Sequence, residues 1–415
     1  MTSDLFTLIF LIAIFIYMTI LLWLNIRQNK AIIQSFDKVP NEFRKEITLK
    51  DHQKATEYTQ AKLKLNHFEV IFSTTILLLW TLGGGLDYLD NIWQEQTDNI
   101  LYAGVGFIVS LIMLGSLIDL PFSVYRTFIL EQKFGFNQTN IKTFITDLLK
   151  GALLVLVIGL PLIYAILYLM DTMSEYWWFY VWLVLIVFSL LIFWLYPTYI
   201  APIFNQFKPL DNIELKTKIN NLLERTGFRS DGIFVMNGSK RSSHANAYFT
   251  GIGKNKRIVF FDTLIKNMSD NEVQAILAHE LGHCHHRHVI KHMISSFITS
   301  LLGLALLSYL INQNWFFHGL GISHPSNHSA LILFTLTIPV FSFLITPINN
   351  YLSRKYEFEA DVFATKHTNA NDLVSSLVKL YRDNAIILAP DYMYSYFHDS
   401  HPSALIRINQ IKTYK

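Results

Sequence analysis

A short stretch in the second half of the chain has the residue types and spacing of a catalytic metal site. His279-Glu280-Leu281-Gly282-His283 is an H-E-x-x-H motif. At 3.6 residues per turn, histidines four positions apart lie on one face of a helix, so both imidazoles can bind one tetrahedral zinc ion. Glu280 is placed to accept a proton from a water molecule on that ion. The motif therefore predicts metal-assisted hydrolysis.

The same letters also fit a polar helix with surface histidines, because histidine is common in this stretch. Its other histidines are His285, His286, His288 and His292. A hydrolytic zinc site needs a third protein ligand. A metzincin would have a histidine six positions beyond His283, and Val289 excludes that class. His286 lies on nearly the same face as the motif, but three ligands on one short arc would strain a tetrahedral site, so we expect His286 at the surface.

A better third ligand lies in the acidic segment Tyr356-Glu357-Phe358-Glu359-Ala360-Asp361. Glu357 and Asp361 are four positions apart and share a helical face, whereas Glu359 points elsewhere. One carboxylate can bind the metal while the other accepts a hydrogen bond from the distal nitrogen of a zinc-bound histidine. Spacing alone leaves open the alternative of an acidic, solvated helix turn.

The elements that must position these residues are those of a membrane protein. Hydrophobic residues make up 52% of the 415 residues and charged residues only 16%, against roughly 25% charged in soluble domains. The apolar residues gather in blocks long enough to cross about 30 Å of hydrocarbon as helices of roughly 20 residues. The seven predicted spans lie near 4–25, 68–87, 101–121, 151–170, 177–197, 293–312 and 329–350.

Net charge and cysteine content exclude other classes of protein. The net charge of +3 is too mild to imply nucleic acid, and no basic recognition stretch is present. The single cysteine, Cys284, cannot form an internal disulfide, so the chain is not a disulfide scaffold.

Charges in the connecting loops predict the orientation of the spans. Lys and Arg occur in 26–66, in 126–150, in 208–291 and in the tail from Arg354, and the intervening stretches contain none. Because Lys and Arg are held on the cytoplasmic side, we expect the N-terminus outside and the C-terminus in the cytoplasm. The outside loop before the last span contains His318, His324 and His328. This loop lies across the membrane from the motif, so we expect an ordinary polar loop.

Two cytoplasmic segments, 198–292 and 351–415, are large enough to hold the chemistry. Each segment alone is small for a stable domain, so we expect the two to pack into one polar unit beneath the helices. The remaining parts, 1–197 and 293–350, hold the first five spans with their cytoplasmic loops and the last two spans. The predicted fold is an all-α membrane protein with a cytoplasmic α+β unit.

Local patterns place the motif within the first of these segments. Residues 232–236 and 257–261 are predicted to form short strands. Ser269 and Glu272 have the spacing of a capping box, which starts a helix that runs to about residue 292 and directly into the sixth span.

Further segments along nearly the whole chain carry a resemblance to a known family. They are Leu120-Pro121-Phe122, Glu131-Gln132-Lys133-Phe134-Gly135-Phe136-Asn137, Pro202-Ile203-Phe204-Asn205-Gln206-Phe207, His244-Ala245-Asn246-Ala247-Tyr248-Phe249-Thr250-Gly251 and His401-Pro402 with Arg407. With the H-E-x-x-H motif and the segment 357–361, they resemble the integral-membrane zinc proteases of the Ste24 type. These are the CAAX prenyl protease 1 family, within peptidase family M48, and HtpX is a more distant relative with fewer spans.

The resemblance implies a gluzincin fold and a zinc site. Seven transmembrane helices would form a ring around a chamber, with a gluzincin-like protease unit on the cytoplasmic side. One Zn²⁺ per chain would be bound by His279, His283 and Glu357. Glu280 would then be the general base, and Asp361 would hold a ligand histidine in place.

The resemblance also implies substrate-binding residues. The stretch Asn246-Ala247-Tyr248 would lie on an edge strand that pairs with the substrate backbone, and Asn246 would bind substrate or intermediate. His401 and Arg407 would stabilise the oxyanion and orient the scissile peptide. Cys284 and Thr250 differ from what many relatives have, which affects the pocket and not the chemistry.

The implied reaction is removal of the last three residues from a prenylated C-terminal peptide. The expected partners are membrane lipid and a prenylated or membrane-associated peptide, with no nucleic acid; the oligomeric state is open. The lack of long insertions favours a bacterial inner membrane over an endoplasmic reticulum. An HtpX-like quality-control protease for membrane proteins is a second interpretation. A multi-span transporter with an incidental motif is a third, but Glu69 and Asp119 lie near predicted cytoplasmic span ends and no broken helix is evident.

Overall fold

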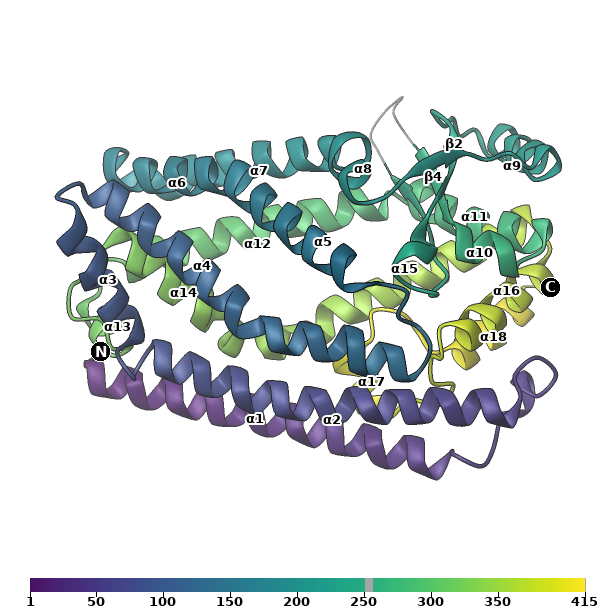
Figure 1. Ribbon diagram of the computed structural model, residues 1–415, viewed down its shortest axis with the longest axis horizontal. Helices are drawn as coiled ribbons and strands as arrows, with labels where there is room; N and C mark the ends of the chain where they lie inside the picture. Colours follow the sequence, from purple (N-terminus) through teal and green to yellow (C-terminus); the bar gives the residue numbers. More distant parts are fainter. Residues whose placement is uncertain (251–256, 415) are drawn as a thin grey trace.

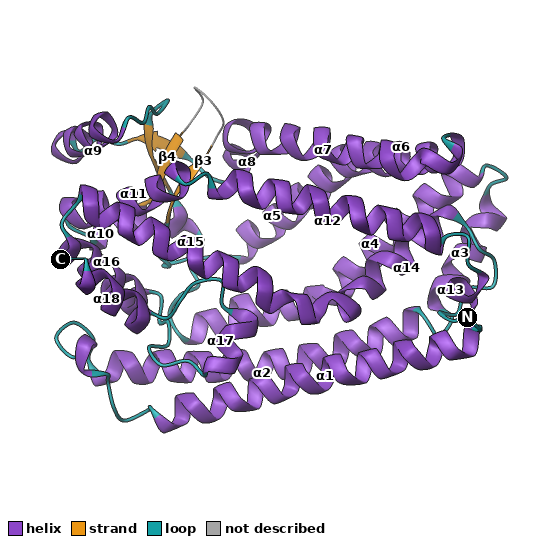
Figure 2. Cartoon of the chain, turned by 180° about the vertical axis from the view of Figure 1, so that it is seen from behind, coloured by secondary structure: helices purple, strands orange, loops and turns teal. Residues whose placement is uncertain are grey.

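Long helices run along the longest axis of the molecule, and a small sheet with shorter helices occupies one end (Figures 1 and 2). The structure is a computed structural model that describes residues 1–250 and 257–414. The first half contains α1 (Ser3–Gln34), α2 (Leu49–Trp80), α3 (Gly85–Gln96), α4 (Ile100–Tyr125), α5 (Ile141–Leu154), α6 (Leu160–Thr172), α7 (Trp177–Leu195) and α8 (Ala201–Phe204). Short π-helical turns, Arg126–Glu131, Val155–Gly159 and Tyr196–Ile200, extend or join several of them.

The second half begins with the sheet and returns to the long helices. Its strands are β1 (Phe207–Pro209), β2 (Ile233–Met236), β3 (Ala247–Thr250) and β4 (Arg257–Phe261). Its helices are α9 (Ile213–Thr226), α10 (Asp262–Asn267), α11 (Asp270–His285), α12 (His288–Leu310), α13 (Asn314–His318), α14 (Asn327–Ser342), α15 (Thr346–His367), α16 (Ala370–Asp383), α17 (Tyr392–His398) and α18 (Ala404–Thr413).

Six helical segments of the described chain are long and apolar enough to span a membrane. They are Ser3–Gln34, Ile100–Glu131, Ile141–Thr172, Ser174–Phe204, His288–Leu310 and Asn327–His367. The pair α2 and α3 passes the same test as one unit bent by 48°, which gives up to seven. All seven predicted blocks overlap these segments. The chain bends between α2 and α3 near Gly84, which has a left-handed φ of 75°, and this break was not predicted from the sequence.

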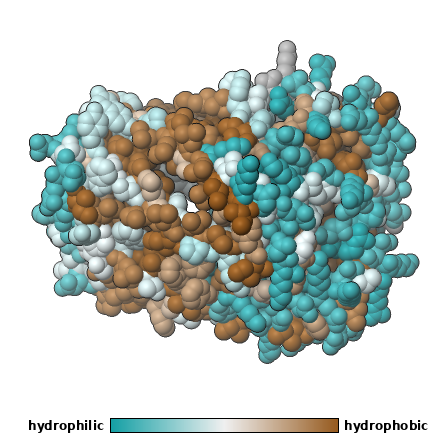
Figure 3. Space-filling view, viewed as in Figure 1, coloured by the Kyte–Doolittle hydropathy of each residue, from teal (hydrophilic) through white to brown (hydrophobic). Residues whose placement is uncertain are grey.

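Side chains on the long helices face outward as they would toward lipid. Phe15, Val187 and Leu302 are 64%, 66% and 63% exposed. Figure 3 shows hydrophobic residues across the middle of the molecule and hydrophilic residues at its ends. Because exposed apolar patches of this extent are not stable in water, the chain is a multi-pass integral membrane protein.

The sheet confirms both predicted strands and exposes one edge. Its order is β1-β2-β4-β3, with β2 and β4 parallel and β3 antiparallel to β4. In the register of the last pair, Ala247 lies opposite Phe260 and Thr250 opposite Arg257. Within the described residues β3 is therefore an edge strand.

The two polar segments pack into one unit. One buried cluster combines Ile258 and Leu277 from the first segment with Phe363 from the second. The capping box is present, since Glu272 N donates to Ser269 Oγ and Ser269 N donates to Glu272. Burial of this apolar cluster joins the sheet, α11 and α15.

Two local expectations are wrong. The helix capped by Ser269 ends at His285 and does not run on to 292, because Arg287 adopts a left-handed φ of 56° and a new helix, α12, begins at His288. His328 is not part of an ordinary polar loop. It is buried in α14, and its Nε2 lies 2.6 Å from Asp90 Oδ1 of α3.

Candidate metal centre

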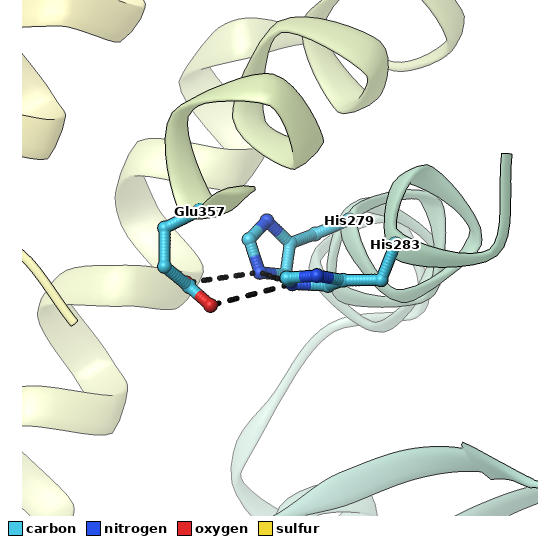
Figure 4. Close-up of side chains that lie close together, drawn as sticks. All are labelled: His279, His283 and Glu357. Carbon is cyan, nitrogen blue, oxygen red and sulfur yellow. Dashed lines mark hydrogen bonds and ion pairs between the residues drawn. The ribbon is translucent and has the colours of Figure 1, made fainter. Parts of the chain in front are cut away.

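Two helices bring three ligand side chains together. His279 and His283 from α11 and Glu357 from α15 point toward one another (Figure 4). The helices can approach closely because Gly282 faces Ala360: a Cβ at Gly282 would lie 2.8 Å from the Ala360 Cα. The glycine inside the H-E-x-x-H motif thus helps to set the distance between the histidines and the glutamate.

The distances among these side chains suit a tetrahedral ion. The Nε2 atoms of His279 and His283 are 3.2 Å apart, and each lies 3.4 Å from an oxygen of Glu357. Ligands bound at the usual zinc distances in tetrahedral geometry are about 3.3 Å from each other. Among the described residues, buried Glu357 Oε2 has no hydrogen-bond partner. A buried carboxylate that turns one oxygen toward each imidazole nitrogen, and whose Oε2 lacks a hydrogen bond, fits a bound cation.

A carboxylate and a guanidinium support His279 from behind. Asp361 Oδ1 lies 2.9 Å from His279 Nδ1, on the ring side opposite the ligand nitrogen. Arg407 of α18 donates from Nε and Nη2 to the two Asp361 oxygens at 2.8 and 2.6 Å. Its Nη1 lies 3.4 Å from Glu357 Oε2. All four side chains are largely buried, so these contacts fix the ring of His279 and one ligand carboxylate together.

A histidine and a glutamate support His283 in the same way. His288 Nδ1 lies 3.0 Å from His283 Nδ1, and His288 Nε2 lies 2.9 Å from Glu359 Oε2. The His288 ring stacks on Tyr356, with centroids 4.2 Å apart, and His288 is only 2% exposed. This pair was not predicted from the sequence. Only the turn at Arg287 folds His288 back against His283, and the motif spacing gave no signal of that turn.

Glu280, the general base predicted from the sequence, lies between two cavities. Glu280 lines a cavity of about 990 Å³ and an adjacent smaller one of about 270 Å³, and Glu357 and His401 line both as well. Burial raises the pKa of Glu280 above its ordinary value. A carboxylate with a raised pKa, next to the ligands and reachable from a cavity, is suited to proton transfer.

The tail residues take different positions in the site. His401 is exposed to the cavity, with its side chain 64% accessible, and its Nε2 lies 3.3 Å from Glu357 Oε1. Arg354 donates to the carbonyl oxygen of Asp399 at 2.8 Å, which holds the loop that carries His401. Arg407 lies behind the ligands, with two hydrogen bonds to Asp361. The geometry therefore gives His401 access to a substrate and gives Arg407 contacts to ligand-supporting groups.

The predicted substrate-binding stretch begins at the start of β3. Asn246 is exposed and lines the larger cavity with Ala247, and Asn246 Oδ1 accepts a hydrogen bond from Ala247 N at 2.8 Å. The Tyr248 ring packs edge-on against Phe261 instead. Ala247 and Tyr248 differ in this way because neighbouring side chains of a strand point to opposite faces of the sheet.

The chain is similar to known membrane proteases over nearly its whole length. A family model described as CAAX prenyl protease N-terminal, five membrane helices, matches residues 28–206, and the model for peptidase family M48 matches 209–415. A CAAX prenyl protease 1 homolog of Homo sapiens is 32% identical over 448 residues, covering 96% of this chain and 94% of that protein. CAAX prenyl protease 1 of Saccharomyces cerevisiae is 31% identical over 418 residues, covering 94% and 91%.

A solved structure shows the same fold. The crystal structure of S. mikatae Ste24p matches with a TM-score of 0.89 and 31% sequence identity, covering 98% of this chain and 99% of that one.

Proposed function

Because the chain belongs to the CAAX prenyl protease group of peptidase family M48, we propose that it is a zinc endopeptidase that removes the last three residues from prenylated C-terminal peptides. The observation that carries this proposal is the convergence of His279, His283 and Glu357 beside a cavity that Glu280 also lines. One zinc ion per chain fits the donor set and its distances.

The residues around the ion divide the work of hydrolysis. When bound, zinc polarises the scissile carbonyl and lowers the pKa of water beside it. Glu280 accepts a proton from that water molecule as the water oxygen forms a bond to the carbonyl carbon. Glu280 then delivers the proton to the departing amine nitrogen as the C–N bond breaks. His401 donates a hydrogen bond to the negative charge that develops on the carbonyl oxygen.

The buried residues behind the ligands position them. Asp361 accepts from His279 Nδ1, which leaves Nε2 as the metal-binding atom, and Arg407 holds Asp361 through two hydrogen bonds. We assign Arg407 to positioning, because its guanidinium is already committed to Asp361. Asn246 and Ala247 offer backbone and side-chain groups at the open edge of β3, where a substrate strand can add.

The setting suits a lipid-anchored substrate. The ligands lie at the polar end of the helices, and the Lys and Arg residues in the loops favour a cytoplasmic location for that end. A peptide whose lipid lies in the bilayer can reach a site at this depth. Relatives named above come from eukaryotes, so the comparisons give no support to a bacterial inner membrane.

A matched pair of peptides tests the substrate class. A farnesylated C-terminal Cys-a-a-X peptide and its unprenylated twin would be incubated with the purified protein in lipid nanodiscs. We expect faster cleavage of the farnesylated peptide between the cysteine and the next residue. Equal cleavage of both would contradict the prenyl preference and favour the quality-control interpretation.

A further inference from the structure

The open edge of β3 sets a direction for the substrate, if the proposed function is correct. β3 pairs with β4 in antiparallel fashion, and antiparallel pairing is the more stable arrangement per residue. A substrate strand added antiparallel to β3 has its C-terminal end beside the start of β3, near Asn246 and Ala247. Its N-terminal end then lies beside Phe249 and Thr250.

The two cavities at the metal centre agree with this direction. The larger cavity includes Asn246 and Ala247, whereas the smaller one includes Phe249 with Val289 and Tyr356. Residues that follow the scissile bond therefore occupy the larger cavity. Three residues of a strand span roughly 10 Å, so the C-terminal carboxylate of the substrate ends inside this cavity. Removing a carboxylate from bulk water is costly unless a cation or hydrogen-bond donor meets it.

Most cations that line the larger cavity already have partners. Arg126 forms an ion pair with Glu69. His244 Nε2 lies 3.5 Å from Glu131 Oε2, and the His244 ring stacks on Phe136. Arg407 pairs with Asp361 and with the ligand Glu357.

Lys62 of α2 is the exception. Its side chain is exposed and lines the larger cavity, and its ammonium lies 4.1 Å from the centre of the Tyr58 ring. Among the ion pairs of the described residues, none involves Lys62. An ammonium on the cavity wall without an ion-pair partner can bind the carboxylate of a substrate.

A chain of contacts connects Lys62 to the segment that leads into β3, and both line the larger cavity. Tyr58, which lies under the Lys62 ammonium, donates its hydroxyl to Glu131. Glu131 in turn pairs with His244, three residues before Ala247. Glu131 also attracts the Lys62 ammonium electrostatically, but its direct contacts are with Tyr58 and His244, and the two groups form no direct ion pair among the described residues.

We propose that the Lys62 ammonium binds the free carboxylate at the C-terminus of the substrate, an inference that rests on the proposed function. This contact selects peptides that end a fixed distance beyond the scissile bond. It makes Lys62 a residue that determines specificity for chain ends over internal segments.

The test compares two farnesylated tetrapeptides that differ only in ending as a carboxylate or a carboxamide. We expect the native protein to cleave the acid about tenfold or more faster in kcat/KM, as for loss of a charged hydrogen bond, mainly through KM. Lys62→Gln should remove the difference between the two peptides, and Lys62→Arg should retain much of it. Lys64→Gln is the matched control, since Lys64 is exposed on the opposite face of the same helix and should keep the native ratio.

Several outcomes would overturn the inference. One is equal cleavage of acid and amide by the native protein, and another is equal slowing of both peptides by Lys62→Gln with the native ratio retained. If the glutamine variant unfolds in a thermal scan, Lys62→Met, which keeps the stem without the charge, serves in its place. Cleavage of neither peptide by the native protein would overturn the proposed function and this inference with it.

Discussion

Removal of the His288 ring nitrogens should weaken metal binding without touching a ligand. His288→Phe keeps an aromatic ring to stack on Tyr356 but deletes the contacts of 3.0 Å to His283 and 2.9 Å to Glu359. His283 Nδ1 then loses a partner inside the protein, which costs about 1–3 kcal/mol. Loss of an outer contact of this kind typically lowers metal affinity about 10–100-fold, which is the same size of effect. We therefore expect a zinc dissociation constant 10–100-fold above the native value.

The assay is competition for zinc between the protein and chelators of graded affinity, with bound metal measured directly, so no activity is needed. His292→Phe is the matched control, because His292 is exposed, contacts the same Tyr356 ring and is not in the chain from His283 to Glu359. A zinc affinity of His288→Phe within about twofold of native would refute the reasoning. So would an equal loss in His292→Phe.

Two further predictions concern the tail and the start of α11. His401→Ala should lower kcat about 100-fold or more with zinc content unchanged, as for loss of one oxyanion donor; loss of zinc would show that His401 supports the metal instead. Burial favours the neutral form of Glu272, but hydrogen bonds with Lys379, Ser375 and Ser269 outweigh it and hold its pKa below the ordinary value. A lowered folded-state pKa stabilises the fold above the ordinary pKa near 4.5, and this contribution is lost as pH falls. Glu272→Gln should therefore lower the free energy of unfolding at pH 7 by about 1–3 kcal/mol, measured as a lower thermal unfolding temperature. The difference in unfolding temperature between native protein and variant should shrink below about pH 4.5; a constant difference from pH 7 to 4 would contradict this.

The parts of the molecule that were predictable from sequence are those set by local patterns. Apolar blocks located the spans, because length and hydropathy decide which helices cross a bilayer. The capping box at Ser269 located the start of α11, because a cap depends on residues three apart. Helical spacing brought the members of the motif to one face.

The parts that were not predictable depend on contacts between distant residues. The position of His288 depends on the left-handed turn at Arg287, a conformation that nothing in the local sequence requires. The pair of His328 and Asp90 joins α14 to α3 across 238 positions. The commitment of Arg407 to Asp361 likewise appears only once α18 packs against α15. Tertiary packing therefore determined which polar side chains are buried partners and which face the cavity.

Comparison of the native protein with Glu280→Gln tests the central claim most directly. Bound zinc would be measured in both proteins, together with cleavage of a farnesylated Cys-a-a-X peptide. We expect equal zinc content, about one ion per chain, and loss of cleavage only in Glu280→Gln, because the substitution removes the proton acceptor and leaves the three ligands in place. Retained turnover in Glu280→Gln, or cleavage by native protein that is free of metal, would contradict the account.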